Sequence, residues 1–414
     1  MELRIAAADG TEDHLLAVLP QATPRYQPGG AWSPDGRTIA VPVLTIGKGE
    51  RYVLDVVDVA DGKVRELHSN AHGIDRPVWL GHGEAMALLL SEDTDQERNQ
   101  LWRIYYPSGE KRRMTSDLSF NSVLDGAQQG NTLSVVQSTL ESRIWAAPKS
   151  REFESKLITP PGLAITEVLA LPTGTLVAQE GGTSALWSLN RDGTGRAQMG
   201  NDLRVQLAAR CGDGIVFMRG YASGWEIVRT NSDGTKPKVL VTHDDLWAPA
   251  CSPDGKYLYY GHRKVPARLV RIPVDGGLET VIAKLTGGIA GGKLSISPDG
   301  KQLAYYYGTF DANSSPGVAM VSVESGAVQK MPLKPIWAQT PLVWSRDGKG
   351  LYMARMDNGV SNVWQLAGLG KPAMQVTHFT SDQILDFALS ADEQTLYVVR
   401  GHATSDVVLM RNPN

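Results

Sequence analysis

The sequence predicts an all-β fold, and three observations support this prediction. First, the 414 residues include 43 Gly and 23 Pro, which are spread along the chain and so indicate many short elements joined by turns. Second, short runs of alternating or β-branched residues are frequent, whereas no stretch repeats apolar residues at helical spacing over a dozen positions. Third, a four-residue turn motif recurs along the chain.

Composition and charge exclude several classes of protein. With 42% hydrophobic and 21% charged residues, the chain can bury a sizeable core. Its 41 basic and 44 acidic side chains give a net charge of −3 without blocks of like charge, so we expect no nucleic-acid partner. The longest apolar run, residues 85–90, is too short for a membrane helix, and the N-terminus shows no secretion signal. We therefore expect no membrane contact by this chain itself.

The recurring motif is a turn between two strands. The tetrapeptide Ser-Pro-Asp-Gly occurs at residues 33–36, 252–255 and 297–300, with looser copies at 345–348 and 390–393. Each copy stands between two short apolar strands. Proline presets φ for the turn, Asp bonds to its own backbone, and Gly adopts the left-handed φ that closes a bulged loop. Each copy therefore predicts a β-hairpin.

Weaker turn signals fill the interval between the first two copies. They occur at residues 81–83, 128–130, 172–174 and 212–214 and bring the predicted hairpins to nine. The hairpins recur at intervals of about 45 residues, which matches a four-stranded blade of a β-propeller. A third strand, often centred on Trp, then an Asp-Gly or Ser-Gly turn and an outer strand complete each unit.

We therefore predict a β-propeller of eight to nine four-stranded blades over residues 1–414. The repeats start near residues 27, 75, 120, 164, 204, 247, 292, 340 and 384. The nine hairpins can form one ring, an eight-bladed ring with a leftover, or two rings with unequal shares, and we favour one ring. Because the last repeat lacks a fourth strand, we expect residues 1–20 to complete it through the strand at 14–18. Residues 3–6 look like a surplus third strand, which indicates a chain cut out of a longer parent.

Motifs for catalysis and phosphate binding are weak. The segment 287–293 has the Gly and Lys spacing of a phosphate loop, but Leu294 stands where Ser or Thr should hold magnesium, and a strand follows where a helix is required. We interpret it as a loop between blades. No Gly-x-Ser-x-Gly nucleophile elbow occurs, so we expect no catalytic residue and no cofactor.

The two cysteines, Cys211 and Cys251, each lie at the end of an innermost strand, 40 residues apart. We expect neighbouring blades to hold them too far apart for a disulfide, so that both pack in the core. Two cysteines are also too few for a structural zinc site.

Histidine and arginine positions indicate a candidate ligand site. In a propeller blade the second strand ends on the face where the fourth strand crosses to the next blade, so two classes of loop meet there. Histidines occur at both kinds of strand end and arginines at second-strand ends, with aromatic residues nearby. The candidate residues are His243, His262, His378, His402, Arg219, Arg355, Arg400, Tyr221 and Trp247.

Such a polar and aromatic rim is typical of a small-ligand site, although a solvated loop face has the same composition. The recurring turn Asp residues are interpreted as turn caps. A metal ion held by three of the histidines would require blades far apart in the sequence to converge, so we expect no metal.

With these turns and Trp-centred strands, the chain resembles TolB-like, WD-type bacterial propellers. Its last hundred residues, especially 361–364, 376–384 and 400–412, resemble the C-terminal propeller of large acidobacterial signalling proteins. In that family a serine/threonine kinase or winged-helix DNA-binding domain precedes the propeller. The resemblance implies such an upstream domain and an extracytoplasmic, periplasmic location. This chain itself contains none of the kinase motifs.

We therefore predict a non-catalytic sensory or interaction module of a bacterial signalling protein. Its loop face would bind a small molecule, a glycan or a protein. Two enzymatic alternatives remain, namely a metal-assisted polysaccharide lyase resembling oligogalacturonate lyase and the gating propeller of a prolyl-oligopeptidase-like peptidase. Repeat motifs determine a fold and do not separate these functions, whereas a stoichiometric bound metal would favour the lyase.

Overall fold

A computed structural model describes residues 1–19, 29–46, 50–70, 73–92, 95–116, 119–126, 132–149, 154–181, 185–200, 205–221, 224–264, 266–286, 289–308, 316–333, 340–368 and 371–411. In this part of the chain the regular elements are all β-strands, which confirms the predicted all-β class. No helix among these residues has the length and apolar character needed to cross a membrane.

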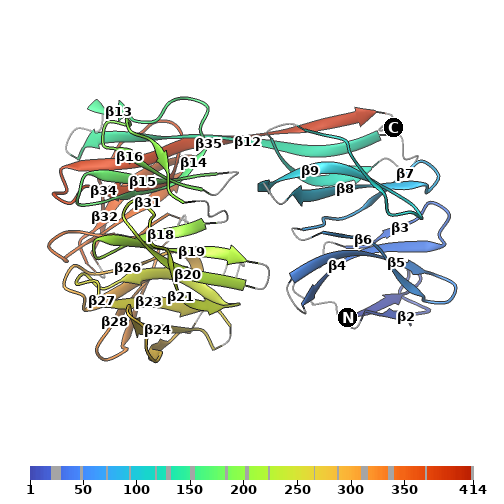
Figure 1. Ribbon diagram of the computed structural model, residues 1–414, viewed down its shortest axis with the longest axis horizontal. Coiled ribbons are helices and arrows are strands. Elements are labelled where there is room, and N and C mark those ends of the chain that lie inside the picture. The colour runs from blue at the N-terminus through green and yellow to red at the C-terminus, as the bar shows by residue number, and fades with distance from the viewer. Residues whose placement is uncertain are drawn as a thin grey trace. The chain divides into compact units, whose positions relative to one another are not determined.

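Figure 1 draws the strands as arrows. All nine predicted hairpins are present. Their strands are β3 (Ala31–Trp32) with β4 (Thr38–Ile46), β7 (Val78–Leu80) with β8 (Ala85–Glu92), β11 (Phe120–Gly126) with β12 (Thr132–Pro148), β14 (Ile165–Ala170) with β15 (Thr175–Glu180), β18 (Val205–Cys211) with β19 (Gly214–Tyr221), β22 (Leu246–Cys251) with β23 (Tyr257–His262), β26 (Ile289–Ile296) with β27 (Gln302–Tyr307), β30 (Val343–Trp344) with β31 (Leu351–Asp357), and β34 (Gln383–Leu389) with β35 (Thr395–Arg411).

Further strands extend these hairpins on their outer side. They are β5 (Glu50–Asp58), β6 (Val64–Asn70), β9 (Asp95–Tyr105), β10 (Lys111–Arg113), β13 (Lys156–Leu157), β16 (Ala185–Asn190), β17 (Ala197–Gln198), β20 (Gly224–Asn231), β21 (Lys238–His243), β24 (Arg268–Pro273), β25 (Thr280–Lys284), β28 (Gly317–Ser322), β29 (Val328–Pro332), β32 (Val360–Leu366) and β33 (Ala373–Gln375). Two strands, β1 (Glu2–Ile5) and β2 (His14–Val18), form a separate pair.

The Ser-Pro-Asp-Gly turns owe their shape to internal hydrogen bonds. The hydroxyl of Ser252 donates to the Asp254 carboxylate at 2.5 Å and accepts from the Tyr257 amide at 2.9 Å. Gly255 closes the turn at a φ of 70°, in the left-handed region. The same Ser-to-Asp bond occurs in the turns that begin at residues 33, 297, 345 and 390. The recurring Asp therefore caps the turn.

The chain divides into two compact units. Unit 1 consists of Met1–Thr139 and Ala403–Asn414, and unit 2 of Leu140–His402. This differs from the single ring that the sequence favoured. Both boundaries fall inside strands of 17 residues, β12 and β35. The repeat pattern predicted two strands and a loop in each of these segments; because each runs on as one strand, it contributes residues to both units.

Unit 2 is a six-bladed propeller. In the part that the structure describes, it contains the sheets β14–β17, β18–β21, β22–β25, β26–β29 and β30–β33, and a sixth sheet made of β34, β35, β12 and β13. From β14 to β30, the first strand of each sheet contacts the first strand of the next, and β34 contacts β14 on one side and β31 and β32 on the other. The series therefore closes into a ring, which confirms the propeller fold.

The sixth blade is completed by strands from the middle of the chain. There β12 pairs with β35, and β13 pairs with β12. Residues 14–18 lie in β2 instead, which pairs with β1 in unit 1, so the expectation that residues 1–20 complete the last blade is wrong. The surplus third strand noticed at residues 3–6 is explained by the same pair, because β1 and β2 form a hairpin of their own.

Unit 1 contains four sheets among the described residues: β1–β2, β3–β6, β7–β10, and a sheet in which β12 lies between β11 and β35. Each sheet shares an apolar core with the next. Ala17 and Leu19 pack with Ile39 on β4, while Leu54 packs with Trp79. At the other end, Leu80 and Leu133 pack with Val408 of β35.

The disulfide Cys211–Cys251 corrects another expectation. Cys211 ends β18 and Cys251 ends β22, and their Cα atoms are 5.0 Å apart, within the distance that a disulfide requires. The prediction that neighbouring blades hold these residues too far apart is wrong because of two glycines. A Cβ placed on Gly255 would lie 3.1 Å from the Cα of Gly212, so the turns of the two blades touch without side chains between them.

Gly401 allows β35 to approach β12 within unit 2. A Cβ at this position would lie 2.0 Å from the carbonyl oxygen of Glu141 and 2.6 Å from the Cα of Ser142. We expect Gly401→Val to lower the free energy of unfolding by about 1–3 kcal/mol, the usual cost of overpacking. Urea unfolding followed by tryptophan fluorescence measures this. The exposed Ala403 on the same strand provides the control Ala403→Val, and equal stabilities of the two variants would contradict the prediction.

Candidate functional site

Three polar residues meet between two adjacent blades of unit 2: the predicted His243 and His262, and Asp245, which was not predicted. His243 ends β21, Asp245 stands immediately before β22, and His262 ends β23. Because β22 and β23 are antiparallel with Leu246 opposite His262, the start of β22 adjoins the end of β23. The loops after a second and a fourth strand thus meet here, as the sequence predicted for His243 and His262.

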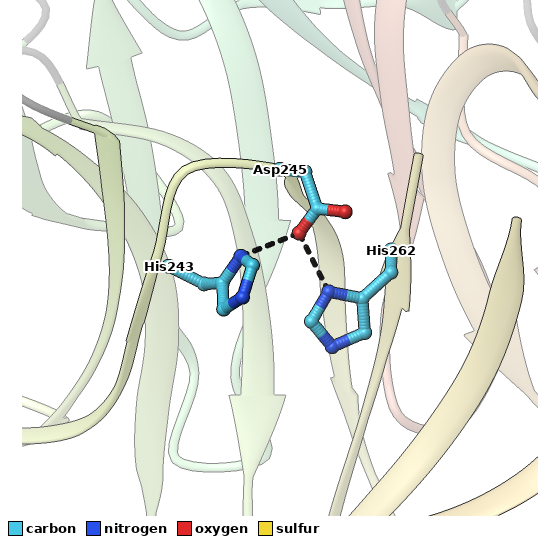
Figure 2. Close-up of side chains that lie close together, drawn as sticks. All are labelled: His243, Asp245 and His262. Atoms are coloured by element: carbon cyan, nitrogen blue, oxygen red, sulfur yellow. Dashed lines mark hydrogen bonds and ion pairs between the residues drawn. The ribbon is translucent and has the colours of Figure 1, made fainter. Parts of the chain in front are cut away.

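Both imidazoles point at one carboxylate oxygen (Figure 2). The Nδ1 atom of His262 lies 2.6 Å from Oδ1 of Asp245, and Nδ1 of His243 lies 2.7 Å from the same oxygen. The two rings meet edge to face, with centroids 4.9 Å apart. Burial would raise the pKa of Asp245, but the hydrogen bond and charge of His262 outweigh it, so this pKa lies below its ordinary value. Asp245 is therefore an ionised acceptor for both rings.

The rest of the cluster holds Asp245 and His262 in place. His262 is 1% exposed, and its Nε2 lies 3.0 Å from Oε2 of Glu279, which also accepts the Tyr260 hydroxyl at 2.9 Å. The Lys264 amide donates to the second oxygen of Asp245 at 3.2 Å. Both nitrogens of the buried His262 ring are thus paired with carboxylates, whereas His243 is exposed.

His243, Asp245 and His262 also form the group that could hold a metal ion in the described part of the chain. Each offers one ligand atom, and these atoms lie within 4.8 Å of one another. Two imidazoles and one carboxylate are ligands that suit zinc and related divalent ions. The sequence analysis identified the two histidines and missed Asp245 and Glu279, although the position of Asp245 two residues after His243 was a usable signal.

A second cluster occupies the equivalent place in the last blade. Asp382 stands immediately before β34, as Asp245 does before β22. Its carboxylate lies 3.1 Å from Nδ1 of His402 and 3.6 Å from Arg400. The Arg400 guanidinium stacks on the Phe379 ring at 3.9 Å from its centroid, and burial lowers its pKa although Asp382 opposes this shift. Two predicted residues, Arg400 and His402, are therefore brought together.

Of the remaining predicted residues, Arg219 and Arg355 contact side chains of their own blades. Arg219 pairs with Glu226 on the neighbouring strand at 2.6 Å, and the Arg355 guanidinium lies 4.9 Å from the Trp364 ring centroid. His378 is exposed. Tyr221 is the last residue of β19, and its side chain lies outside the described residues.

Trp247 was predicted in an exposed rim, but the structure places it in the core. It is fully buried, its Nε1 donates to the Gly292 carbonyl at 3.1 Å, and its ring meets Tyr305 edge-on. The reason is that all six residues of β22 are buried, so a side chain on this innermost strand packs between blades. Trp247 therefore belongs to the core between blades and offers no contact surface.

Three charged residues meet inside the ring of unit 2. Sequence reasoning named only Lys293 among them, as the Lys of the phosphate-loop spacing at 287–293, and it missed Glu167 and Asp386. Nζ of Lys293 on β26 lies 2.8 Å from Asp386 on β34 and 3.0 Å from Glu167 on β14. The Lys293 side chain is 14% exposed and that of Asp386 is 3% exposed. The sequence analysis interpreted residues 287–293 as a loop between blades. In the structure β26 begins at Ile289, so Lys293 lies within a strand. We call these three residues the central triad.

Backbone amides complete the central triad. Glu167 accepts from the amides of Leu207 at 2.8 Å and Ala208 at 3.2 Å, and Asp386 accepts from that of Val168 at 2.9 Å. Burial raises the pKa of Asp386 to about 6 against the charge of Lys293. Burial would lower the pKa of Lys293, but the two carboxylates outweigh it and raise this pKa above its ordinary value. The triad thus joins three blades by buried charges.

No protein-family model matches the sequence, and no curated protein does either. Among solved structures, a TolB protein from Agrobacterium tumefaciens is 17% identical, with a TM-score of 0.53 over 64% of this chain and 99% of that chain. TolB from Acinetobacter baumannii is 12% identical, with a TM-score of 0.38 over 93% and 87%. An oligogalacturonate lyase in complex with manganese is 10% identical, with a TM-score of 0.36 over 90% and 96%. The first similarity supports a TolB-like propeller fold.

Proposed function

We propose that unit 2 is a non-catalytic binding module whose ligand or protein partner contacts the face that carries His243 and Arg400. The observation that carries this proposal is the repeated cluster of basic and acidic side chains immediately before a first strand, at Asp245 and again at Asp382. Loops on a rigid scaffold are the usual carriers of binding. Both clusters lie at the same end of their blades, because each adjoins the start of a first strand and the second strand opposite it.

The chemistry of this face suits a polar partner. His243, His378 and His402 are exposed. The Arg400 side chain is 11% exposed and places its guanidinium over the Phe379 ring. Such groups form hydrogen bonds with hydroxyl and carboxylate groups and stack on apolar ring faces, so glycans and acidic peptides are the partners that we favour.

The triple variant His243→Ala, His378→Ala, Arg400→Ala tests this proposal. The intact chain is screened on a glycan array, and the best hit is measured by calorimetry. We expect at least a tenfold loss of affinity in the triple variant. The matched control is Lys256→Ala, Lys301→Ala, Lys349→Ala, which removes three exposed cations beside the turns at the opposite ends of the blades. Unaltered binding by the triple variant, or equal loss in the control, would exclude this face.

We also propose that the module is the sensory part of a larger bacterial signalling protein and acts outside the cytoplasm. The sequence resemblance to acidobacterial signalling propellers supports the first part. The disulfide Cys211–Cys251 supports the second part, because disulfides persist in oxidising compartments. Fractionation of cells that express the parent gene, followed by thiol labelling under denaturing conditions, tests the location and the oxidation state together.

A metal-assisted lyase is the second candidate, and the ligand set of His243, Asp245 and His262 is the observation that favours it. The test is incubation of the purified chain with oligogalacturonate and manganese, followed by ultraviolet absorbance of the unsaturated product. Product formation that is lost in His243→Ala would favour the lyase over the binding module.

A further inference from the structure

We propose that His243, Asp245 and His262 form a zinc site with one open coordination position. This inference does not rest on the binding function proposed above, because it concerns a metal ion and the three side chains in Figure 2. Two histidines and one carboxylate are the protein ligands of zinc sites that keep a fourth position for water or another ligand.

The three ligand atoms lie within 4.8 Å of one another, so zinc coordination requires their separations to change by at most about 1.5 Å. The two Nδ1 atoms lie 2.6 and 2.7 Å from Oδ1 of Asp245. Zinc bonds of roughly 2.0–2.2 Å place tetrahedral ligand atoms about 3.3 Å apart, so each nitrogen has to move away from the oxygen by less than about 1 Å. Zinc would replace the protons that now bridge these atoms. His243 can follow, because its side chain is 47% exposed.

The residues around the cluster already have the arrangement of a second coordination sphere. Glu279 faces Nε2 of His262 at 3.0 Å, and the Tyr260 hydroxyl fixes the same carboxylate oxygen. A carboxylate that accepts the outer N–H of a histidine fixes its tautomer and presents the other nitrogen to the metal. The Lys264 amide occupies Oδ2 of Asp245, which leaves Oδ1 as the ligand atom.

The open position lies toward solvent. Asp245 and His262 are buried, whereas His243 and Asp244 are exposed. Oδ1 of Asp244 lies 3.1 Å from Nδ1 of His243, and its other oxygen pairs with Lys264. A water molecule or an anionic ligand can therefore reach the fourth position from the side of His243, where Asp244 can accept its hydrogen bond.

Zinc and cobalt titrations test the site. The intact chain is freed of metal with a chelator and titrated with zinc against a chromophoric competitor, and with cobalt by visible absorption. We expect one zinc per chain and the intense absorption of tetrahedral cobalt. His243→Ala and Asp245→Asn should each weaken zinc binding at least 100-fold. His402→Ala is the matched control, because it removes an exposed histidine beside Asp382.

Thermal unfolding without metal separates binding from folding. His243 is exposed, so His243→Ala should unfold at the temperature of the unsubstituted chain and should lose only the zinc-induced increase. If Asp245→Asn fails to fold, the zinc affinity of His243→Ala decides whether these residues bind the metal. The proposal is overturned if no zinc binds, or if His243→Ala binds it as tightly as the unsubstituted chain does.

Discussion

Replacement of Lys293 by Met should lower the free energy of unfolding of unit 2 by about 3–5 kcal/mol, the cost of removing one partner from a buried ion pair. Lys293 is the cation that both Asp386 and Glu167 contact, at 2.8 and 3.0 Å. Without it, two carboxylates from different blades would face each other in the ring interior. Because methionine has about the volume of the lysine stem, the loss of unfolding free energy reflects the removed charge more than a change in packing.

Urea unfolding followed by circular dichroism and tryptophan fluorescence measures this effect. The control is Lys301→Met, which changes an exposed lysine in a turn and should stay within about 0.5 kcal/mol of the unsubstituted chain. Combining Lys293→Met with Asp386→Asn should recover part of the loss, because the amide oxygen can still accept the Val168 amide while one negative charge is removed. A cost below about 1 kcal/mol for Lys293→Met would show that the central triad contributes little to stability.

The loss of unfolding free energy in Lys293→Met should depend on pH in a defined direction. Burial raises the pKa of Asp386 from 3.8 to about 6, so the folded chain binds this proton more tightly than the unfolded chain does. The stability that comes from this group is therefore present at low pH and is lost as pH rises from about 4 to about 6. Removing Lys293 strengthens this dependence, and we expect the cost of Lys293→Met to be smaller at pH 5 than at pH 8.

Local turn chemistry was predictable from the sequence, whereas the division into units was not. In the hairpins at Ser33 and Ser252, each residue of the turn favours the same backbone conformation. Interactions between neighbours in the sequence are therefore enough to form these turns. The division depends on β12 and β35, where strands run on through segments that the repeat assigned to loops. β12 pairs with β35, which brings Ser138 against Ser405, 267 positions away. No local pattern reports such a contact.

The candidate site shows the same contrast. His243 and His262 were found because strand order alone brings the ends of a fourth and a second strand together. The central triad was missed although its members share a repeat position: Lys293 and Asp386 each stand four residues before the turn serine of their blade, Ser297 and Ser390. When the repeats are compared, a position that carries Lys in one blade and Asp in another looks variable. Opposite charges at this position are nevertheless what ion pairs between blades require.

The second large effect should come from the disulfide Cys211–Cys251. Its cysteines are 40 residues apart, and the chain-entropy model gives about 4 kcal/mol for a loop of that length. We therefore expect the double variant Cys211→Ser, Cys251→Ser to lose about 2–4 kcal/mol of unfolding free energy. At roughly 2–4 °C per kcal/mol for a domain of this size, its melting temperature should fall by about 10 °C.

Reduction provides the matched comparison for this variant. A phosphine reductant should leave the double serine variant unchanged. It should destabilise the unsubstituted chain only by the part of the loss that comes from the cross-link between β18 and β22. Both sulfur atoms lie in a buried cluster with Val216 and Leu258, so serine adds a buried hydroxyl whose cost reduction does not share. The difference between the two losses therefore measures the cost of burying that hydroxyl. If the reduced chain melted at the same temperature as the oxidised chain, the contact of Gly212 with Gly255 would hold these blades together without the disulfide.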